Sequence, residues 1–418
     1  MDMNILLIGS GGREHALAWK LAKSKKIDKI YVAPGNGGTA KENKCINIDI
    51  TDIEELIKFA KENNIDLTVV GPEEPLINGI VDRFKEEGLK IFGPGKSGAR
   101  LEGSKSFSKD FMKKYGVKTA EYEVFYKEDK AKEYLKTCKY PVVIKADGLA
   151  AGKGVVICES LEEALETIDL FMVSDIFKGA GKKVVIEEFL EGVEASILSI
   201  TDGHTIIPFL SAKDHKQIFD GNKGPNTGGM GALCPNPYVT EEILEDFRVN
   251  IMEKTLVGIR EENFDFKGII FFGIMITESG AKLLEYNVRM GDPETQSVLS
   301  LMETDLLDLI EASLDERLNE IEVKWKDGFC LNVVMSSNGY PKSIKTGYKI
   351  NILDDVKEDV FIAGAKLNDN DLVTSGGRVL SVIGRGKTIE EARENVYKNI
   401  EKVSFEGAYF RKDIGIAK

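Results

Sequence analysis

The sequence contains little of what metal centres and disulfide frameworks require. Its 418 residues include only five cysteines and three histidines. The cysteines are scattered, with no CxxC pair, and His15, His204 and His215 form no cluster near them. This pattern argues against structural zinc and against a set of disulfides, so we expect the thiols to stay reduced.

A basic face and a long apolar segment are also missing. The formal net charge is -13 and the pI is about 5.1, which argues against nucleic-acid binding and against anionic membrane surfaces. No apolar run approaches the roughly 20 residues of a membrane span, and the first residues lack a basic region followed by a long apolar segment. We expect a cytoplasmic protein whose partners are small molecules, with no nucleic acid and no membrane.

The pattern of the first hundred residues predicts a small parallel α/β domain. A chain of 418 residues exceeds what one core usually supports, so two to four domains or subdomains are expected. Helices are expected from about residue 14, behind a capping box of Thr51 and Glu54, and from about residue 76. Apolar strands alternate with them at residues 5–8, 30–33, 67–70 and 90–92. In such a domain, ligands meet the loops at the carboxyl ends of the strands.

Three glycine-rich polar loops follow these strands. The first, residues 9–15, resembles a dinucleotide-binding fingerprint, but Glu14 stands where the third glycine should be. Two interpretations stay open for it: a tight turn that needs glycine, and a loop whose amides bind phosphate or sugar. Loops 34–38 and 71–75 fall at the same edge of the sheet. Three such loops at one edge favour a ligand site.

Residues 95–104 mark a predicted domain boundary. After them, Ser104 opens a helix whose apolar side includes Phe111 and Met112. Lys105, at the start of this helix, either stays in solvent or contacts a phosphate.

A glycine-rich segment farther on joins two predicted strands. Strand 142–145 leads through loop 147–154 directly into strand 155–157. The loop lacks the Ser or Thr and the following helix of a Walker A motif, so it is not a P-loop. It is typical of a hairpin flap that lays backbone amides over a triphosphate, with Lys145 neutralising phosphate charge. A plain long turn is the alternative.

Two later segments carry polar side chains suited to a small ligand. Strand 184–188 ends in acids beside apolar residues that could enclose a base, and surface charge is the alternative. Residues 213–231 are polar over a length at which loops are generally functional or disordered. Asp214, His215, Lys216 and residues 227–229 could then form a substrate pocket, with disorder as the alternative.

Residues 282–294 combine a strand pattern with a high density of acids. Because side chains on a strand repeat every second residue, one face carries an acid, an amide and a guanidinium: Glu285, Asn287 and Arg289. The alternating positions are apolar and are expected in the core: Leu284, Tyr286 and Val288. A sheet with one wet face would explain this alternation too. However, Asp292 and Glu294 add two carboxylates, which is unfavourable unless a cation neutralises them. Carboxylate and amide oxygens suit Mg²⁺ on a nucleotide, and an arginine can grip a phosphoryl group.

From about residue 331 the pattern changes to short strands and turns. A final helix is expected behind Thr388 and Glu391, with Ala392 and Val396 facing the core. This pattern predicts a small α+β cap domain. Arg378, after two glycines, either clamps a phosphate or is a solvated hairpin residue.

Taken together, these motifs resemble the ATP-grasp ligases and, within them, the phosphoribosylamine glycine ligase family. The resemblance spans nearly the whole chain in order: IGSGGREHALAWKL, VVGPEEPLINGIVD, LEGSKSFSKDFM, VVIKADGLAAGKGV, EEFLEG, DHK, GPNTGGMGA, RMGDPETQ, TSGGRVL and YFRKDIG. It implies an N-terminal parallel α/β substrate-binding domain (1–102), a central ATP-grasp domain (103–328) and a C-terminal α+β cap domain (329–418). Residues 120–192 would be a mobile subdomain that covers ATP.

The resemblance also implies a reaction. ATP, glycine and 5-phosphoribosylamine would give glycinamide ribonucleotide, ADP and phosphate through a glycyl phosphate intermediate, in de novo purine biosynthesis. No protein nucleophile is needed, so catalysis would consist of positioning, charge stabilisation and exclusion of water. Mg²⁺ or Mn²⁺ would accompany ATP, and the enzyme would be a monomer or a dimer.

Site residues follow from the resemblance by matching positions. ATP would contact Lys105, Lys145, Gly152, Lys153, Gly154, Glu187, Glu188, Phe189, Leu190 and Glu194. The metal would be held by Glu285 and Asn287. Arg289 would steady the acyl phosphate, and the glycine would be surrounded by Asp214, Thr227, Gly228, Gly229, Asp292 and Glu294. Lys216 would be a further substrate-binding residue. Phosphoribosylamine would be lined by Gly9, Gly11, Gly12, Asn36, Glu73 and Arg378.

Two positions depart from the family pattern. Gly273 stands where a second acidic metal ligand is common, which leaves open whether one or two ions bind, and Met290 replaces an aromatic residue or leucine. Other functions remain as alternatives: a related ligase or carboxylase with another carboxylate substrate, a nicotinamide oxidoreductase, and an ATP-binding regulator without catalysis. The stretch 214–231 favours the glycine ligase, and the broken fingerprint disfavours the oxidoreductase.

Overall fold

The N-terminal unit is the predicted parallel α/β domain. The computed structural model describes residues 2–148, 154–174, 176–177 and 179–416. The first strands are β1 (Met3–Gly9), β2 (Ile27–Pro34), β3 (Cys45–Asn47), β4 (Leu67–Val70) and β5 (Ile91–Pro94). They pair in parallel in the order β5-β4-β1-β2-β3. The helices between them are α1 (Gly12–Ala22), α2 (Ile53–Glu62), α3 (Glu73–Ile77) and α4 (Ile80–Glu86).

Two helix starts differ from the sequence expectation. Asp52, not Thr51, caps α2: its carboxylate accepts hydrogen bonds from the amides of Glu54 and Glu55 at 3.0 and 3.1 Å. Aspartate is at least as favourable as threonine at this position. Helix α3 begins at Glu73 rather than near residue 76, so much of the predicted third loop is its first turn.

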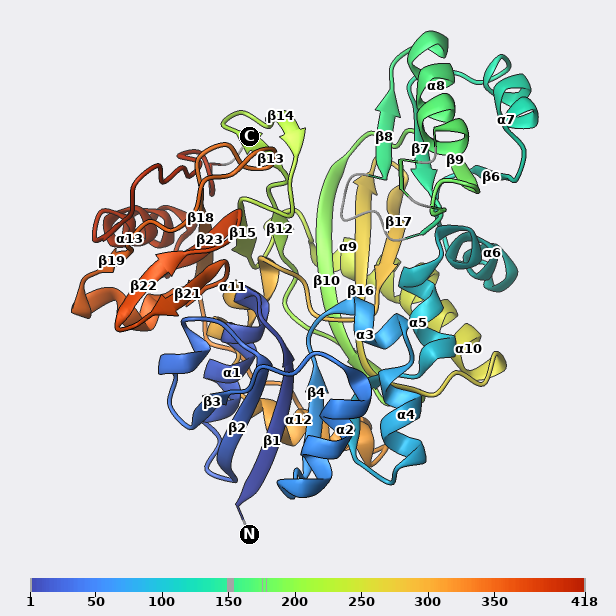
Figure 1. The fold of residues 1–418 in the computed structure, drawn as a ribbon. Coiled ribbons are helices and arrows are strands. Elements are labelled where there is room, and N and C mark those ends of the chain that lie inside the picture. Colours follow the sequence, from blue (N-terminus) through green and yellow to red (C-terminus); the bar gives the residue numbers. More distant parts are fainter. Residues whose placement is uncertain (1, 149–153, 175, 178, 417–418) are drawn as a thin grey trace.

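One long strand joins this domain to the centre of the molecule. The first residues of β16 (Phe266–Thr277) pair with β5, and its remaining length pairs with β10 (Val193–Thr201) and β17 (Gly280–Asn287). With β11 (Ile206–Pro208), these strands form one nine-stranded sheet. Figure 1 shows β10, β16 and β17 rising from the N-terminal domain toward the upper part of the molecule.

A separate four-stranded sheet belongs to the predicted covering subdomain, residues 120–192. Its order is β6-β9-β7-β8, with β6 (Tyr122–Phe125), β7 (Val142–Ala146), β8 (Val155–Cys158) and β9 (Val184–Glu188). Helices α7 (Glu128–Leu135) and α8 (Leu161–Ile168) help to give it an apolar core of its own. Strands β7 and β8 are antiparallel, as the hairpin interpretation predicts. The subdomain connects to the N-terminal domain through α5 (Lys96–Gly103) and α6 (Lys105–Tyr115), and Ser104 caps α6 as expected.

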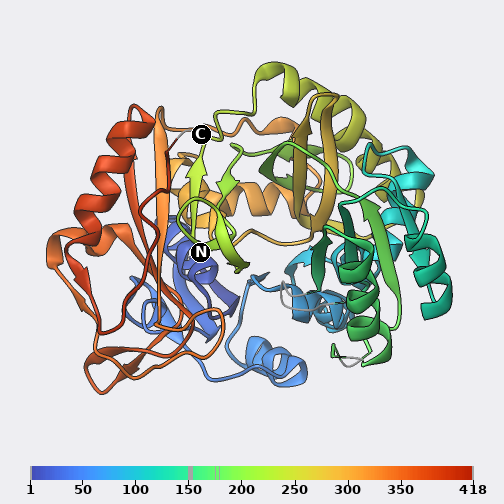
Figure 2. The same cartoon turned by 90° about the horizontal axis from the view of Figure 1, so that it is seen from above.

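The C-terminal domain is built on a five-stranded sheet that includes strands from the central region. Its order is β12-β15-β18-β23-β20, with β12 (Lys213–Asp214), β15 (Gly231–Cys234), β18 (Phe329–Ser336), β20 (Val360–Ile362) and β23 (Arg378–Gly386). Helix α13 (Ile389–Ile400), capped by Thr388, packs on it, and shorter pieces complete the domain: β19 (Asn351–Ile352), β21 (Ala365–Asn368), β22 (Asp371–Thr374) and β24 (Val403–Ser404). Seen from above, this domain and the covering subdomain lie on opposite sides of the central elements (Figure 2).

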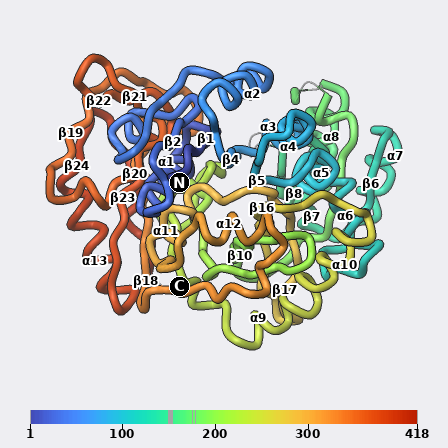
Figure 3. Tube along the Cα trace, turned by 90° about the horizontal axis from the view of Figure 1, so that it is seen from below, coloured from blue at the N-terminus to red at the C-terminus, as the bar shows by residue number. Residues whose placement is uncertain are grey.

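The polar stretch 213–231 is therefore not one long loop. It contains β12, the hairpin of β13 (Gln217–Phe219) and β14 (Lys223–Asn226), and the start of β15. The remaining helices are α9 (Glu241–Phe247), α10 (Glu253–Glu261), α11 (Glu294–Leu301) and α12 (Leu306–Leu314). From below, α11 and α12 lie beside α1 (Figure 3). Within the described ranges, no helix has both the length and the apolar character needed to cross a bilayer.

Candidate active site

Strand β17 carries the predicted metal ligands, and a bulge changes which of its side chains share a face. Gly273 of β16 lies opposite Glu285, whereas the next residue, Ile274, lies opposite Leu283, so Leu284 is the extra residue. Tyr286 and Val288 lie in the central core as expected, but Leu284 does not. It packs instead with a small apolar cluster: Ala120, Leu190 and Met275. The prediction that Leu284 faces the core was wrong because the bulge shifts the period-two alternation by one residue.

Glu285 is a carboxylate surrounded by cations that do not touch it. It makes no hydrogen bond or ion pair with any described residue, yet four cationic side chains act on it electrostatically: Lys216, Lys145, Lys105 and Arg289. Burial alone would raise the pKa of Glu285, but these cations outweigh burial and hold the pKa below its ordinary value. Glu285 therefore stays ionised among four cations, three of which also pair with other acids: Lys145, Lys216 and Arg289. Lys105 forms no ion pair with a described residue, so its charge is open to an additional anion.

The donor set at Glu285 fits a metal ion that arrives on a nucleotide. Asn287 follows on the same strand, and its exposed fraction is 9%. Among the described residues, no group of three or more His, Cys, Asp or Glu side chains is arranged to hold a metal. Mg²⁺ at nucleotide sites usually takes only one or two carboxylates, with phosphates and water as its other ligands. A carboxylate and an amide beside a cationic space meet that description.

Two buried lysines share the carboxylate of Glu187. Lys145 Nζ lies 2.9 Å from Glu187 Oε1, and Lys109 Nζ lies 3.0 Å from Oε2. Burial lowers the pKa of Lys109 to about 8, even though Glu187 opposes the shift. Sequence reasoning missed Lys109, because a lysine on an amphipathic helix is ordinarily solvated. The predicted ATP residue Glu187 is thus already engaged in a buried ion-pair network.

The other predicted ATP residues each contact a different partner. Lys105 Nζ donates to the carbonyl of Gly148 at 3.4 Å, and burial lowers the pKa of Lys105. Glu194 pairs with Lys216 at 2.6 Å, whereas Glu188 turns to Lys282 at 3.0 Å. Phe189 is half-buried next to Leu190, and the carbonyl of Gly154 accepts a hydrogen bond from Ala146 at 2.8 Å. Gly152 and Lys153, also predicted here, lie outside the described residues.

Arg289 lies just past the end of β17 and is held by two acids. Its Nη2 is 2.8 Å from Glu102 and its Nε is 3.1 Å from Glu73. Glu102 also accepts a hydrogen bond from the amide of Val288 at 2.7 Å, so it fixes both the arginine and the backbone beside it. Sequence reasoning quoted Glu102 within a motif but gave it no role. No local pattern links residue 102 to residue 289.

Asp214 and Glu294 form a pair of acids with too little positive charge around them. Burial, followed by the nearby Glu294 carboxylate, raises the pKa of Asp214 well above its ordinary value. Burial likewise raises the pKa of Glu294, whose Oε1 accepts a hydrogen bond from Ser196 at 3.0 Å. Asp214 Oδ1 is buried and has no hydrogen-bond partner in the part of the chain that the structure describes. This pair suits a ligand that brings a positive charge and hydrogen-bond donors.

The predicted segment 227–229 closes one side of this acid pair. A Cβ atom on Gly229, which has φ +115°, would lie 2.6 Å from Asp214 Oδ1, so only glycine allows this close approach. The hydroxyl of Thr227 donates to the carbonyl of Lys216 at 2.7 Å, and Gly228 donates to the Tyr340 hydroxyl at 3.1 Å. The segment is thereby fixed to both the central region and the C-terminal domain.

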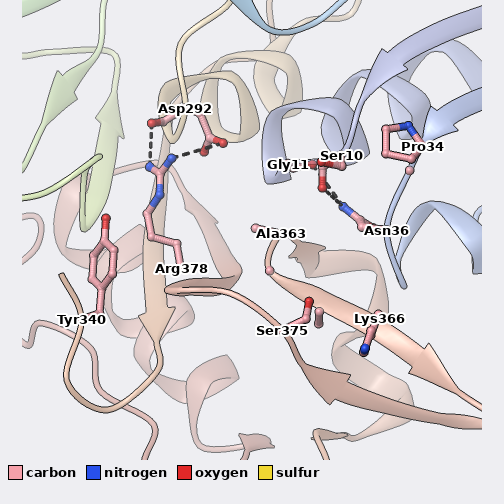
Figure 4. A pocket seen from close by; sticks show the side chains of 13 residues that line it. Ser10, Gly11, Pro34, Asn36, Asp292, Tyr340, Ala363, Lys366, Ser375 and Arg378 are labelled. Carbon is pink, nitrogen blue, oxygen red and sulfur yellow. Dashed lines mark hydrogen bonds and ion pairs between the residues drawn. The ribbon is translucent and has the colours of Figure 1, made fainter. Parts of the chain in front are cut away.

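A cavity of about 490 Å³ lies where the N-terminal and C-terminal domains meet Asp292. Its lining includes four of the predicted substrate-site residues: Gly11, Asn36, Asp292 and Arg378. Figure 4 shows Arg378 bound to Asp292, and Asn36 bound to the loop of Ser10 and Gly11. Arg378 and Arg13 hold the pKa of Asp292 below its ordinary value, although burial alone would raise it. Gly9, Gly12 and Glu73 do not line this cavity in the described structure.

Glu14 explains why the first glycine loop is not a dinucleotide site. Its carboxylate accepts a hydrogen bond from the amide of Gly11 at 2.6 Å and an ion pair from Arg13 at 2.5 Å. Glu14 is 1% exposed and lies against Gly9 and Gly71. The Glu14 carboxylate therefore occupies the space that a phosphate would need in a dinucleotide fold. It also accepts the hydrogen bond of the Gly11 amide, which the phosphate would otherwise accept.

The end of the chain fixes the hairpin that follows Lys216. Arg411 is 1% exposed and donates to the carbonyl of Gln217 and the side chain of Asn222 at 3.0 and 2.9 Å. Asp413, which pairs with Arg411 at 2.7 Å, accepts a hydrogen bond from the amide of Gly221 at 2.8 Å. Sequence reasoning quoted YFRKDIG but assigned no function to it.

Three family profiles match consecutive parts of the chain. They are described as phosphoribosylglycinamide synthetase N domain (residues 3–102), ATP-grasp (A) domain (residues 103–295) and C domain (residues 330–417). Together they cover most of the sequence in the order that the family requires.

Named relatives and solved structures agree with these profiles. The chain is 66% identical to phosphoribosylamine–glycine ligase of Clostridium acetobutylicum over 100% of both chains. It is 51% identical to the enzyme of Fusobacterium nucleatum, over 99% of this chain and 98% of the relative. The crystal structure of the Thermotoga maritima enzyme superposes with a TM-score of 0.85 at 36% identity, covering 98% of this chain and 100% of that one. A biotin carboxylase domain from Hydrogenobacter thermophilus, solved with MgADP and bicarbonate, shares the fold alone: TM-score 0.73, 17% identity, 98% and 92% coverage.

Proposed function

The chain belongs to the phosphoribosylglycinamide synthetase family, and from that premise we propose that the groups around Glu285, Asp214 and Asp292 divide the work of its reaction. That reaction is the ATP-dependent ligation of glycine to 5-phosphoribosylamine in purine biosynthesis. The opposite charge balance at Glu285 and at Asp214 carries the proposal, because the first suits an anion and the second a cation.

The cationic region receives the triphosphate of ATP. Lys105 and Lys145 contact phosphate oxygens, helped by the predicted flap amides of residues 152–154. The apolar cluster with Leu190 and Leu284, next to Phe189, encloses the adenine, and Glu194 reaches the ribose. Glu285 and Asn287 would hold Mg²⁺ or Mn²⁺, which neutralises phosphate charge when bound. Once Lys145 contacts phosphate, Lys109 keeps Glu187 paired.

The acid pair receives glycine. Its ammonium group donates hydrogen bonds to Asp214 and Glu294, and the close approach of Gly229 keeps the space small. This places the glycine carboxylate toward Arg289 and the γ-phosphoryl group. A carboxylate oxygen attacks phosphorus, the bond from phosphorus to ADP breaks, and glycyl phosphate forms. Arg289, held by Glu102 and Glu73, stabilises the charge on the acyl phosphate.

The cavity beside Asp292 receives 5-phosphoribosylamine. Asp292 stays ionised and accepts a hydrogen bond from the amine, which orients the nitrogen lone pair toward the acyl carbon. Attack forms the amide bond, phosphate leaves with the electron pair of the broken C–O bond, and the departing phosphate takes up the proton that the nitrogen loses. The protein supplies no nucleophile. It positions the reactants and excludes the water that would hydrolyse glycyl phosphate.

Three structural units serve these steps. We propose boundaries at 1–102, 103–328 and 329–418, with residues 120–192 closing over ATP, because that subdomain has its own apolar core. The enzyme would act in the cytoplasm as a monomer or a dimer. Light scattering of the purified chain would measure the mass of the assembly.

A coupled assay tests the proposed function. ADP should appear only when Mg²⁺ or Mn²⁺, glycine and phosphoribosylamine generated in situ are all present. Each omission should reduce ADP release to background, and product analysis should show glycinamide ribonucleotide. ADP release with bicarbonate in place of glycine would favour a carboxylase instead.

A further inference from the structure

The cavity beside Asp292 has two chemically different ends. Figure 4 shows Asp292 and Arg378 at one side, whereas Lys366 and Ser375 lie together at the opposite side. Asp292 belongs to the loop that precedes α11. Lys366 and Ser375 come from the C-terminal domain, on β21 and just after β22. The cavity thus joins an acid and a base that are separated across its width.

Of the described residues, two cations line the cavity, and they differ in how many contacts they already make with other residues. Arg378 donates to the carbonyls of Gly228 and Asp292, at 2.7 Å each, and pairs with the Asp292 carboxylate at 3.4 Å. Lys366 is exposed and forms no ion pair or side-chain hydrogen bond with any described residue. The charge of Lys366 is therefore available to a ligand, and the charge of Arg378 is largely used.

We propose that Lys366 and Ser375 bind the 5′-phosphate of phosphoribosylamine, so that the substrate lies across the cavity with its amine at Asp292. This inference rests on the proposed function, because that function supplies a ligand with an amine at one end and a phosphate at the other. A phosphate needs a cation and hydroxyl donors. The lining offers such a combination on both sides, Arg378 with Tyr340 and Lys366 with Ser375, but of these two cations only Lys366 is not already bound by a described residue. A volume of about 490 Å³ is also within the usual range for sites that enclose a small molecule.

The orientation assigns a role to the C-terminal domain. The N-terminal loops and Asp292 face the ribose and the amine, and β21 and the turn after β22 recognise the phosphate. Unphosphorylated ribosylamine would lack the contact with Lys366. The domain would thus select a phosphorylated sugar.

Binding of two stable probes to the full-length chain tests this inference. Ribose 5-phosphate has the phosphate but not the amine, and ribose lacks both. Isothermal titration should show that Lys366→Met weakens ribose 5-phosphate binding roughly ten- to hundredfold, the usual effect of losing a hydrogen bond to a charged group. Binding of ribose should be unchanged. Ser375→Ala should weaken ribose 5-phosphate severalfold.

Lys398→Met is the matched control, because Lys398 is an exposed lysine on α13 in the same domain. It should leave both affinities unchanged. In the coupled assay, Lys366→Met should raise the KM for phosphoribosylamine and leave the KM values for ATP and glycine as in the wild type. Equal ribose 5-phosphate affinity in wild type and Lys366→Met, in an active enzyme, would overturn the phosphate assignment alone. Absence of glycine-dependent ADP release in the wild type would instead contradict the proposed function.

Discussion

Glu285 and Asp214 are both carboxylates of the candidate active site, but their surroundings shift their pKa values in opposite directions. Burial disfavours the ionised form of each. At Glu285 the surrounding cations outweigh burial, whereas at Asp214 the neighbouring Glu294 adds to it. Lys216 acts on both, so the difference comes from the rest of each environment. The comparison shows that charge balance, rather than residue type, indicates the sign of the ligand that each region binds.

Glu285→Gln should have the largest effect. The change keeps the shape of the side chain but removes the charge that would hold a divalent ion. We expect turnover to fall roughly 10²- to 10³-fold, comparable to the loss of one electrostatic contact in a preorganised site. Steady-state kinetics measure this effect. The unfolding temperature should fall slightly, because Glu285 makes no hydrogen bond or ion pair with a described residue but its charge is attracted by the surrounding cations. Wild-type turnover in this variant would remove Glu285 from the mechanism.

Asp214→Asn removes one charge from the acid pair of Asp214 and Glu294. Loss of one carboxylate should raise the KM for glycine roughly ten- to hundredfold, because the ammonium group loses a charged acceptor. The KM for ATP should stay close to the wild-type value, since the triphosphate lies beside Glu285. A parallel rise in both KM values would show that the two regions are not separate sites.

Arg289→Lys tests the connection between the two regions. Lysine keeps the charge but cannot present the planar fork that contacts Glu102 and Glu73 together. We expect kcat to fall by about tenfold, with little change in the KM values. Glu102→Gln should give a smaller loss of kcat. Comparing the two variants shows whether the contact between Glu102 and Arg289 contributes to turnover. Unchanged kcat for Arg289→Lys would mean that the arginine is only structural.

Arg411→Met should change the kinetics for glycine and leave the kinetics for ATP as in the wild type. Arg411 holds the hairpin after Lys216, so its loss should raise the KM for glycine severalfold and lower the unfolding temperature. Arg393→Met is the control, because Arg393 lies in the same domain, donates to the carbonyl of Lys412 and stacks on the Tyr397 ring, and forms no hydrogen bond with a described residue of the hairpin. If both variants changed glycine and ATP kinetics equally, Arg411 would have no specific positioning role.

Stability should respond to pH at Asp214. Folding raises the pKa of this carboxyl, so its ionised form costs stability in the folded protein. Below its ordinary pKa the wild type and Asp214→Asn should be equally stable. As the pH rises through the raised pKa, the wild type should lose stability relative to the variant, by on the order of 1 kcal/mol. Chemical unfolding at several pH values measures the difference. A wild type that is the more stable protein at neutral pH would contradict the pKa assignment.

Local patterns predicted much of the fold. The parallel strands of the N-terminal domain, the β7–β8 hairpin and the caps at Ser104 and Thr388 depend on residues close together in the sequence. Such features have period and composition signals that can be read directly. The shared face of Glu285 and Asn287 was predicted for the same reason, because side chains on a strand repeat every second residue.

The remaining features depend on contacts between distant segments. The bulge at Leu284 follows from the way β17 pairs with β16 at Gly273 and Ile274, and the sequence of β17 alone does not predict it. The stretch 213–231 is ordered by pairing with β18 and by Arg411, which lies far along the chain. Glu102 reaches Arg289 across a similarly large separation. The sequence could therefore predict which residues carry charge, but not which of those charges cancel one another.

Calorimetric titration of ATP, with and without Mg²⁺, into wild type and Glu285→Gln is the decisive experiment. If Glu285 helps to hold a metal on the triphosphate, Mg²⁺ should strengthen ATP binding in the wild type and have little effect in the variant. The same strengthening by Mg²⁺ in both proteins would contradict the assignment of the metal to β17.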